Sequence, residues 1–539
     1  MKKSNSKILV IIILCTVFAC KEQANKQDKE PKISNTQNQE TEEVLYRPNY
    51  HFTPDVGWMN DPNGMFYYNG YYHLYYQHYP DGNKWGPMHW GHATSNDMIK
   101  WKEQPIALFP DEKGYIFSGS AVVDIENTSG FGTDGKVPII AIFTYHNKER
   151  EKAKRLDVES QAIAYSLDEG LTWTKYSNNP VIKNPGIKDF RDPKVSWNAE
   201  YKKWVMVLAA HDKVMFYSSK DLKSWELLSD FGDDLSKKVG THGGVWECPD
   251  LFPLPIEGSN ETKWVLYVSV NPGGPNGGSA TQYFIGDFDG TTFTMDKEFE
   301  ENLNNNHNFW IDFGKDNYAG VTFSNISSKT NGKFYMGWMS NWEYANDVPT
   351  ETWRSAMTLA REIKMIKDNN SYRLSFKPVE EINSYKGKKF KKEDIKIKEP
   401  IILLQSANAS LSHSIIDFEI SNFENQGFTF KLSNDKENNL LFGYNENSKV
   451  FFIDRSKSGK TDFSEKFSKK ISVAKRISNN KKLTGKIILD KTSIEIFFDG
   501  GSTVMTEIFF PETPFEKLSL ESNKGLTLET LIANELNIN

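Results

Sequence analysis

The stretch SLDEGLTW at residues 166–173 decides the fold, because its pattern recurs three more times along the chain. Each copy is a polar turn with an aspartate, followed by an aromatic residue that opens a strand-like run. The four copies are SNDMIKW (95–101), SLDEGLTW (166–173), SSKDLKSW (218–225) and DFDGTTF (287–293). Their last residues lie 72, 52 and 68 positions apart, a period suited to one four-stranded blade with variable loops. The repeat therefore predicts a β-propeller.

The rest of the folded chain also reads as all-β. Short apolar runs bounded by Gly, Asn and Asp, such as 65–76 and 203–210, have the character of strands, and helical periodicity is scarce. Tryptophan disappears in the last third of the chain, where alternating runs such as 414–420 predict a β-sandwich with one buried face per strand. We place the boundary at residue 385, which gives a propeller at 45–384 and a sandwich at 385–539.

The N-terminus carries the features of an export signal. Three lysines precede an apolar run at 8–19, which is too short to span a bilayer comfortably. The run ends in Val-Phe-Ala-Cys and resembles the bacterial lipoprotein box, so residues 1–19 are predicted to be a signal peptide and Cys20 to be lipidated; an ordinary signal peptide cleaved nearby is the alternative. Residues 20–44 contain almost nothing apolar and are predicted to form a flexible tether. The protein is thus expected to be exported and anchored at the cell surface or in the periplasm.

Composition excludes several functions. Of 539 residues, 65 are Lys or Arg and 71 are Asp or Glu, so the net charge of −6 offers no electrostatic footprint for nucleic acid. Membrane contact is expected only through the lipid. Aromatic residues make up 13% of the chain, and such rings often present flat faces to sugars.

Three short motifs pair a carboxylate with proline in this strand-rich region: WMNDPNG (58–64), FRDPK (190–194) and WECPD (246–250). Each one alone is also explained as an ordinary turn. Their acids, Asp61, Asp192 and Glu247, are far enough apart to lie on different blades, whose innermost strands converge on one central funnel. A propeller would gather them into one pocket.

Carboxylates of this kind, without a metal-ligand array, suit glycoside hydrolysis. One carboxylate attacks the anomeric carbon while a second carboxylic acid protonates the leaving oxygen. The two need different pKa values, which burial beside other carboxylates can provide.

At these motifs the chain resembles glycoside hydrolase family 32, which includes invertases, inulinases and levanases. FSGS (117–120), GWMSNW (337–342), TWRSAMTLARE (352–362) and SIEIFFDGGSTVMTEIFFP (493–511) extend the resemblance to about residues 46–539. It implies a five-bladed propeller followed by a sandwich, and a catalytic site that needs no metal or cofactor.

The resemblance also implies site residues and their roles. Asp61 is expected to be the nucleophile, Glu247 the acid/base and Asp192 the transition-state stabiliser. Residues expected to bind the substrate are Asn60, Gln77, Trp85, Phe117, Ser118, Arg191 and Trp342.

The function expected from the sequence is therefore an exported β-fructosidase, a retaining hydrolase of levan or inulin, with sucrose as a further substrate, that releases fructose from chain ends. Two alternatives stay open: a fructan-binding surface lipoprotein without hydrolysis, and a fructosyltransferase. Linkage preference, endo or exo attack and oligomeric state are not encoded in the motifs.

Overall fold

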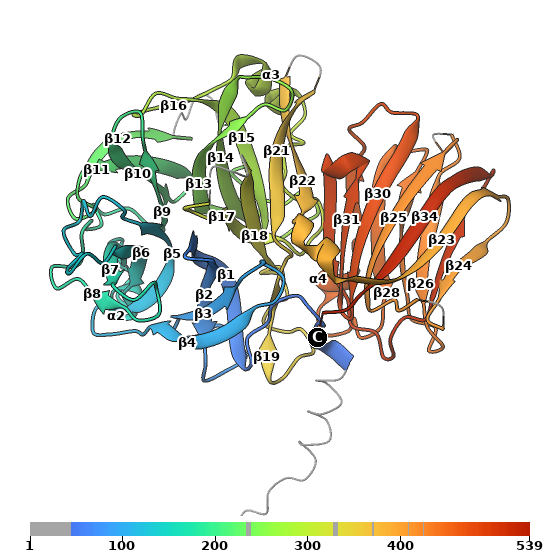
Figure 1. The fold of residues 1–539 in the computed structure, drawn as a ribbon, viewed down its shortest axis with the longest axis horizontal. Coiled ribbons are helices and arrows are strands. Elements are labelled where there is room, and N and C mark those ends of the chain that lie inside the picture. Colours follow the sequence, from blue (N-terminus) through green and yellow to red (C-terminus); the bar gives the residue numbers. More distant parts are fainter. Residues whose placement is uncertain are drawn as a thin grey trace, which may run out of the picture.

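The computed structural model describes residues 45–232, 239–326, 332–368, 371–407, 409–423 and 425–538. These residues form a propeller of five sheets beside a sandwich of two sheets (Figure 1). The expected signal peptide, Cys20 and tether lie outside the described residues. Within the described residues, no helix is both long and apolar enough to cross a membrane.

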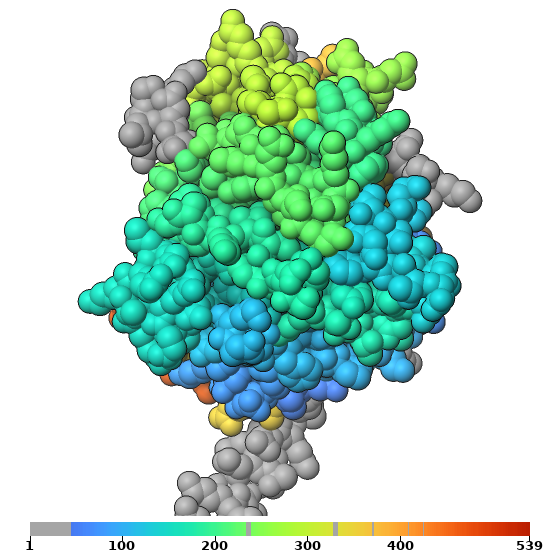
Figure 2. All heavy atoms as spheres, turned by 90° about the vertical axis from the view of Figure 1, so that its left-hand side faces the viewer, coloured from blue at the N-terminus to red at the C-terminus, as the bar shows by residue number. Residues whose placement is uncertain are grey.

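The propeller has five blades, each an antiparallel sheet built mostly from consecutive hairpins. Seen from the side opposite the sandwich, the blades form one continuous surface, from blue segments at the bottom to yellow-green segments at the top (Figure 2). Blade one contains β1 (Gly57–Tyr68), β2 (Tyr71–Tyr79), β3 (His89–Ser95) and β4 (Lys102–Leu108). Blade two contains β5 (Tyr115–Val123), β6 (Ile139–His146), β7 (Glu159–Ser166) and β8 (Thr174–Lys175). Blade three contains β9 (Phe190–Asn198), β10 (Lys203–Ala210), β11 (Lys213–Ser219) and β12 (Glu226–Phe231). Blade four contains β13 (Val245–Pro255), β14 (Thr262–Asn271), β15 (Ala280–Phe288) and β16 (Phe293–Met295). Blade five contains β17 (Tyr318–Thr322), β18 (Lys333–Met339), β20 (Ala356–Met357), β21 (Arg361–Asp368) and β22 (Ser371–Pro378).

The innermost strands close into a ring. In chain order β1, β5, β9, β13 and β17 each contact the next, and β17 contacts β1. The short strand β19 (Trp353–Arg354) pairs in parallel with the start of β1, through Gly57 with Trp353 and Trp58 with Arg354. This pairing ties the segment between β18 and β20 to the first blade, so the ring is sealed by backbone hydrogen bonds as well as by packing.

The sequence repeat corresponds to one turn in each of the first four blades, between its third and fourth strands. Its aspartate accepts backbone N–H groups that follow it, as Asp97 does from Ile99 and Lys100 and Asp221 does from Lys223 and Ser224. An aspartate that satisfies the turn in this way explains why the residue recurs at this position. The fifth blade has no copy of the motif, which is why four copies correspond to five blades.

The helices that lie wholly within the described residues are few and short. They are α2 (Lys148–Lys152), α3 (Lys297–Asn305), α4 (Glu465–Ser468) and the 3-10 turns η2 (Glu380–Tyr385) and η3 (Asp499–Gly501). The longest, α3, begins at Asp296, whose side chain accepts the backbone N–H of Phe299, and it buries Phe299 and Leu303 against the fourth blade and the outer strand of the fifth. Helix α2 joins β6 to β7 and brings a carboxylate to the site described below.

The sandwich packs two six-stranded antiparallel sheets against each other. One sheet runs in the order β23 (Lys386–Ile397), β34 (Leu526–Leu536), β25 (His413–Ser421), β30 (Lys482–Asp490), β31 (Ser493–Phe498) and β32 (Thr503–Ile508). The other runs β24 (Ile401–Gln405), β33 (Lys517–Glu521), β26 (Phe428–Ser433), β27 (Asn439–Asn445), β28 (Val450–Lys457) and β29 (Ser472–Lys475). Rings from both sheets meet in the core, for example Phe451 and Phe498 at 3.9 Å between centroids. The sequence boundary at residue 385 falls where η2 ends and β23 begins.

Buried ion pairs join the propeller to the sandwich. Arg361 of β21, fully buried, contacts Asp312 at 2.8 Å and Glu495 of β31 at 2.5 Å. His51 lies between Glu495 and Asp490, with each of its ring nitrogens 2.9 Å from a carboxylate oxygen. Buried charges are tolerated only when they are paired, so moving the two domains apart would leave these groups without their partners. The contacts therefore hold the domains together.

Candidate active site

All five innermost strands lose their regular pairing at the same end, where each begins. In each strand two residues are skipped in the register with the neighbouring strand. The skipped pairs are Asn60-Asp61, Phe117-Ser118, Asp192-Pro193, Cys248-Pro249 and Ala319-Gly320. Such bulges re-aim side chains, and the bulged residues bring five of the site's side chains, from three blades, into one pocket.

The local sequence explains three of the five bulges, those on the first, third and fourth blades. A proline lacks the N–H group that a ladder hydrogen bond needs, and Pro62, Pro193 and Pro249 each follow within two residues of a site acid. Asp192 and Cys248 also have positive φ angles, 66° and 45°, which side-chain-bearing residues rarely adopt. Backbone strain of this kind collects at functional sites.

The bulges surround a pocket of about 390 Å³ at the centre of the ring. All ten residues expected to act on or bind the substrate line it. They are Asn60, Asp61, Gln77, Trp85, Phe117, Ser118, Arg191, Asp192, Glu247 and Trp342. Five further residues line the same pocket and were not anticipated: His146, Glu151, Glu159, Asp189 and Asn346.

Asp61 is held by side chains on two blades. Asn60 donates from Nδ2 to Oδ1 at 2.9 Å, and Ser118 donates from Oγ to Oδ2 at 2.8 Å. Trp58 fixes the Asn60 amide by donating to its Oδ1 at 2.7 Å. Burial raises the pKa of Asp61, and the bonds from Asn60 and Ser118 oppose that rise because they stabilise the ionised form.

Glu247 is held at both oxygens. Arg191 donates to Oε1 from Nε at 3.3 Å and from Nη2 at 3.1 Å, while the Tyr318 hydroxyl donates to Oε2. Burial raises the pKa of Glu247, Arg191 and Tyr318 lower it, and the nearby charge of Asp61 raises it. The balance lies above the ordinary value of a glutamate, which suits a group that must hold a proton before the reaction.

Asp192 is almost fully buried, 5% exposed. Its Oδ2 accepts the backbone N–H of Cys248 at 3.0 Å. Burial, together with the charges of Glu247 and Asp61, raises the pKa of Asp192 to about 8 although Arg191 opposes the shift. The negative charges of Asp61 and Glu247 disfavour the ionised form of Asp192, so the protonation of these three acids is linked.

The Cys248 thiol links two of the acids. Its Sγ is 3.6 Å from Oδ2 of Asp61 and 3.6 Å from Oδ2 of Asp192. Burial and the three carboxylates raise the pKa of this thiol well above its ordinary value. It is therefore a neutral hydrogen-bond donor and not a nucleophile.

Aromatic rings and one unsatisfied amide form the rest of the wall. Trp85 meets Phe117 edge to face at 6.0 Å, and Trp342 stacks on Trp58 at 5.8 Å. Gln77 is 2% exposed, and its Nε2 has no hydrogen-bond partner among the described residues. A buried donor that faces a pocket without a partner is a place where a ligand oxygen belongs.

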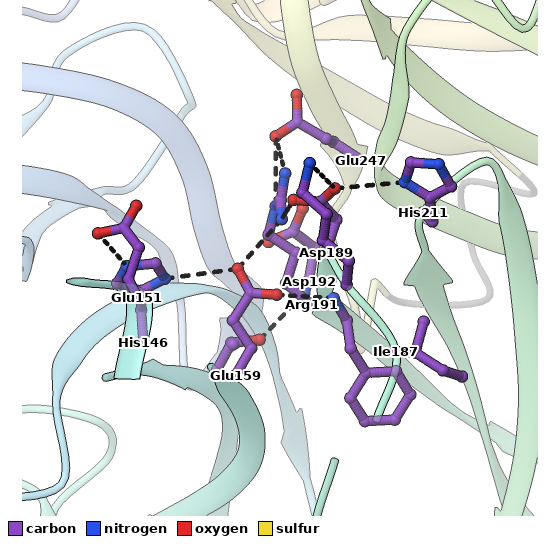
Figure 3. Close-up of polar contacts among 12 residues, drawn as sticks. His146, Glu151, Glu159, Ile187, Asp189, Arg191, Asp192, His211 and Glu247 are labelled. Carbon is purple, nitrogen blue, oxygen red and sulfur yellow. Dashed lines mark hydrogen bonds and ion pairs between the residues drawn. The ribbon is translucent and has the colours of Figure 1, made fainter. Parts of the chain in front are cut away.

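Four of the unanticipated residues, His146, Glu151, Glu159 and Asp189, form a polar wall on the second and third blades. Glu159 and Asp189 contact Arg191, and His146 contacts Glu159 (Figure 3). Asp189 is two residues from Arg191 in the sequence and could have been found by that proximity, but Glu159 and His146 carry no motif. No three His, Cys, Asp or Glu side chains in the described parts of the chain are arranged to hold a metal ion.

Two family models match this chain. The model described as "Glycosyl hydrolases family 32 N-terminal domain" matches residues 51–378, and "Glycosyl hydrolases family 32 C terminal" matches residues 381–538.

Characterised relatives match over most of the chain. A levanase of Bacillus subtilis (strain 168) is 45% identical over 494 residues, which cover 91% of this chain and 70% of the relative. An extracellular exo-inulinase of Aspergillus niger is 40% identical over 512 residues, covering 89% and 93%.

Solved structures agree with the fold. An exo-inulinase from Aspergillus awamori superposes with a TM-score of 0.81 at 35% identity, covering 91% of this chain and 99% of the other. A variant fructofuranosidase from Schwanniomyces occidentalis, in complex with fructosylnystose, superposes with a TM-score of 0.80 at 34% identity, covering 92% and 98%.

Proposed function

The chain belongs to family 32 of the glycosyl hydrolases, and we propose that it removes fructose from the ends of fructan chains by a retaining, double-displacement mechanism. Relatives named levanase and extracellular exo-inulinase support a fructan-hydrolysing β-fructosidase, and the exo-inulinases favour attack at chain ends. The structure of a fructofuranosidase with bound fructosylnystose supports a fructo-oligosaccharide in the pocket.

In the first step Asp61 attacks C2 of the terminal fructosyl unit. The bond from C2 to the leaving oxygen breaks, that oxygen takes the proton from Glu247, and an ester joins C2 to Asp61. The two donors on Asp61, Asn60 and Ser118, orient its oxygens and keep it ionised.

In the second step Glu247, now ionised, removes a proton from water. The water oxygen bonds to C2, the ester to Asp61 breaks, and fructose leaves with its original configuration. The raised pKa of Glu247 supports the first role, and the bonds from Arg191 and Tyr318 support the second because they stabilise the ionised form.

Asp192 is proposed to hold the fructosyl hydroxyls. When a sugar replaces water in the pocket, its hydroxyl groups can donate hydrogen bonds to the Asp192 carboxylate. These hydrogen bonds strengthen as positive charge develops at the sugar ring. Gln77 offers the sugar a donor that has no other partner among the described residues. Trp85, Phe117 and Trp342 supply apolar faces for the ring.

One observation carries this proposal. Three carboxyl groups from three different blades line one pocket, and each has a different set of hydrogen-bond donors. Distinct environments are what assign a nucleophile and an acid to chemically similar groups.

We further propose that the protein is exported and held on a membrane by lipid on Cys20. The lysines and apolar run at 1–19 support export, as do the printed names of the extracellular relatives. Labelling cells with a radioactive fatty acid is expected to mark the full-length protein and not its Cys20→Ala variant. Equal labelling of both, or of neither, would refute the anchor.

The activity is tested with protein that begins at Lys21, incubated separately with levan, inulin and sucrose. Fructose alone is expected from the first time point, and Asp61→Ala is expected to release none. Early oligosaccharides would instead mean endo attack, and new longer oligosaccharides would mean fructosyl transfer. Glycan binding without any product would support the alternative of a fructan-binding protein that does not hydrolyse its ligand.

A further inference from the structure

Arg191 contacts three carboxylates and not only the acid/base. Its Nη2 is 3.1 Å from Oε1 of Glu247, and its Nη1 is 3.1 Å from Oε1 of Glu159 and 2.8 Å from Oδ1 of Asp189 (Figure 3). The guanidinium therefore points one edge toward Glu247 and the other toward the polar wall. Because the fork is planar and rigid, fixing one edge fixes the other.

Glu159 is itself firmly placed. It is 4% exposed at the start of β7, its Oε2 accepts the backbone N–H of Phe190 at 2.6 Å, and its Oε1 is 3.4 Å from Nδ1 of His146. His146 in turn stacks on Phe117 with ring centroids 4.2 Å apart and has its Nε2 3.4 Å from Glu151 of α2. Blade two thus supports Arg191 from outside the third blade.

Asp189 is tied to the strand that carries Glu247. His211 reaches Asp189 with its ring at 3.3 Å, and its backbone N–H donates to the Asp189 carbonyl at 3.0 Å. The carbonyl of His211 accepts the N–H of Trp246, the residue before Glu247, at 2.7 Å. Asp189 and Glu247 are therefore held at a fixed separation with Arg191 between them.

The charges matter as much as the geometry. Although burial acts to raise their pKa values, the charge of Arg191 holds the pKa of both Glu159 and Asp189 below the ordinary value, so both are ionised. Arg191 stays protonated throughout. The negative charges of Glu159 and Asp189 thus lie beside the positive charge of Arg191. They offset much of the effect of Arg191 on Glu247.

We propose that Glu159 and Asp189 are positioning residues that aim Arg191 at Glu247 and offset its charge, so that the acid/base is oriented by an arginine without losing its proton too early. The inference rests on the proposed function, since it assigns Glu247 as the acid/base. It adds two positioning residues that act on the acid/base through Arg191.

Other charged and titratable groups face the same acid. The groups that face Glu247 are Arg191 and Asp192 from β9, Asp61 from β1, Tyr318 from β17 and the neighbouring Cys248. None of them is altered in the variants below.

The test compares the pH dependence of kcat/KM for sucrose hydrolysis, whose alkaline limb reports the acid in the free enzyme. Glu159→Gln removes the charge and keeps the shape. With less negative charge beside it, Arg191 acts more strongly on Glu247, lowers its pKa, and is expected to move the alkaline limb to lower pH by about half to one unit. Asp189→Asn is expected to move it in the same direction by less, because Asp189 is more exposed.

Glu159→Asp separates charge from placement. It keeps the charge but shortens the side chain, so kcat is expected to fall while the alkaline limb moves less than in Glu159→Gln. Asp157→Asn is the matched control, since Asp157 pairs with Arg150 and Arg155 two residues from Glu159 but outside the pocket. It is expected to change neither kcat nor the pH profile.

An unmoved or upward-moving alkaline limb in both Glu159→Gln and Asp189→Asn would overturn the proposal. If Glu159→Gln fails to fold, Asp189→Asn decides the question alone. A failure of the proposed function would give a different result, because the unaltered protein itself would hydrolyse none of the fructosyl substrates.

Discussion

Tyr318→Phe is predicted to make the acid/base harder to ionise. Tyr318 opens β17, is 1% exposed, and donates its hydroxyl hydrogen bond to Oε2 of Glu247. Burial, reinforced by the charge of Glu247, raises the pKa of Tyr318 well above its ordinary value, so the hydroxyl remains a donor across the working pH range. The bond stabilises ionised Glu247, and its loss therefore raises the pKa of that group.

The size of the shift follows from the bond that is lost. A hydrogen bond to a charged group contributes about 1.5–3 kcal/mol, and 1.36 kcal/mol corresponds to one pKa unit, so about one to two units is the upper range. Protonated Glu247 can donate to the phenol oxygen and recover part of this energy. An upward shift of about one unit is expected.

The assay is kcat/KM for sucrose hydrolysis from acid to alkaline pH. The alkaline limb is expected to move upward by about one unit, opposite in direction to Glu159→Gln. Because less of Glu247 is then ionised when water must be activated, kcat is expected to fall at the acid end of the range. Tyr335→Phe is the control: this buried phenol of the same blade donates to Asn317 and touches no site acid. An unmoved alkaline limb in Tyr318→Phe, or one that moves downward, would refute the electrostatic reasoning.

Three further predictions concern the nucleophile and the domain junction. Ser118→Ala removes one donor from Asp61, so the acid limb of kcat/KM is expected to move upward by about half a unit; a downward shift would contradict the assigned bond. Arg361→Met leaves buried Asp312 without its cation and Glu495 with His51 alone, and is expected to lower the free energy of unfolding by about 3–5 kcal/mol in chemical denaturation. A loss below about 1 kcal/mol would mean that the pairs are not a structural link. The two buried carboxylates beside His51 raise its pKa to about 9 against the opposing effect of burial. The pKa of His51 in the folded protein exceeds its value in the unfolded chain. The contribution of His51 to the free energy of unfolding, about 3 kcal/mol, is therefore complete below about pH 6.5 and is lost as the pH rises through 9. Tm is expected to fall over that window, and to fall less in His51→Gln.

The acids and the propeller were predictable because both leave local marks in the sequence. Asp61 and Asp192 each precede a proline and Glu247 lies two residues before one, and in these three strands the proline interrupts the ladder at the bulge. The aspartate turns mark four blades because each closes the same hairpin in the same way. The fifth blade lacks that turn, so its existence came only from the family resemblance.

The polar wall was not predictable because it is created by packing between blades. Glu159 belongs to the third strand of blade two and reaches Arg191 only because the second and third blades are adjacent in the ring. Tyr318 meets Glu247 across the gap between the fourth and fifth blades. No spacing along the chain encodes either contact.

The central claim is that Asp61 forms a covalent bond to the sugar, and trapping that bond tests it most directly. The Glu247→Gln variant, which cannot activate water, is mixed with β-fructosyl fluoride, because the fluoride leaving group needs no proton. The protein is then digested, and the masses of its peptides are measured by mass spectrometry. One fructosyl unit is expected on the peptide that contains Asp61 and absent when Asp61 is changed to Ala. Turnover of the fluoride without any adduct, or an adduct on another residue, would contradict the mechanism.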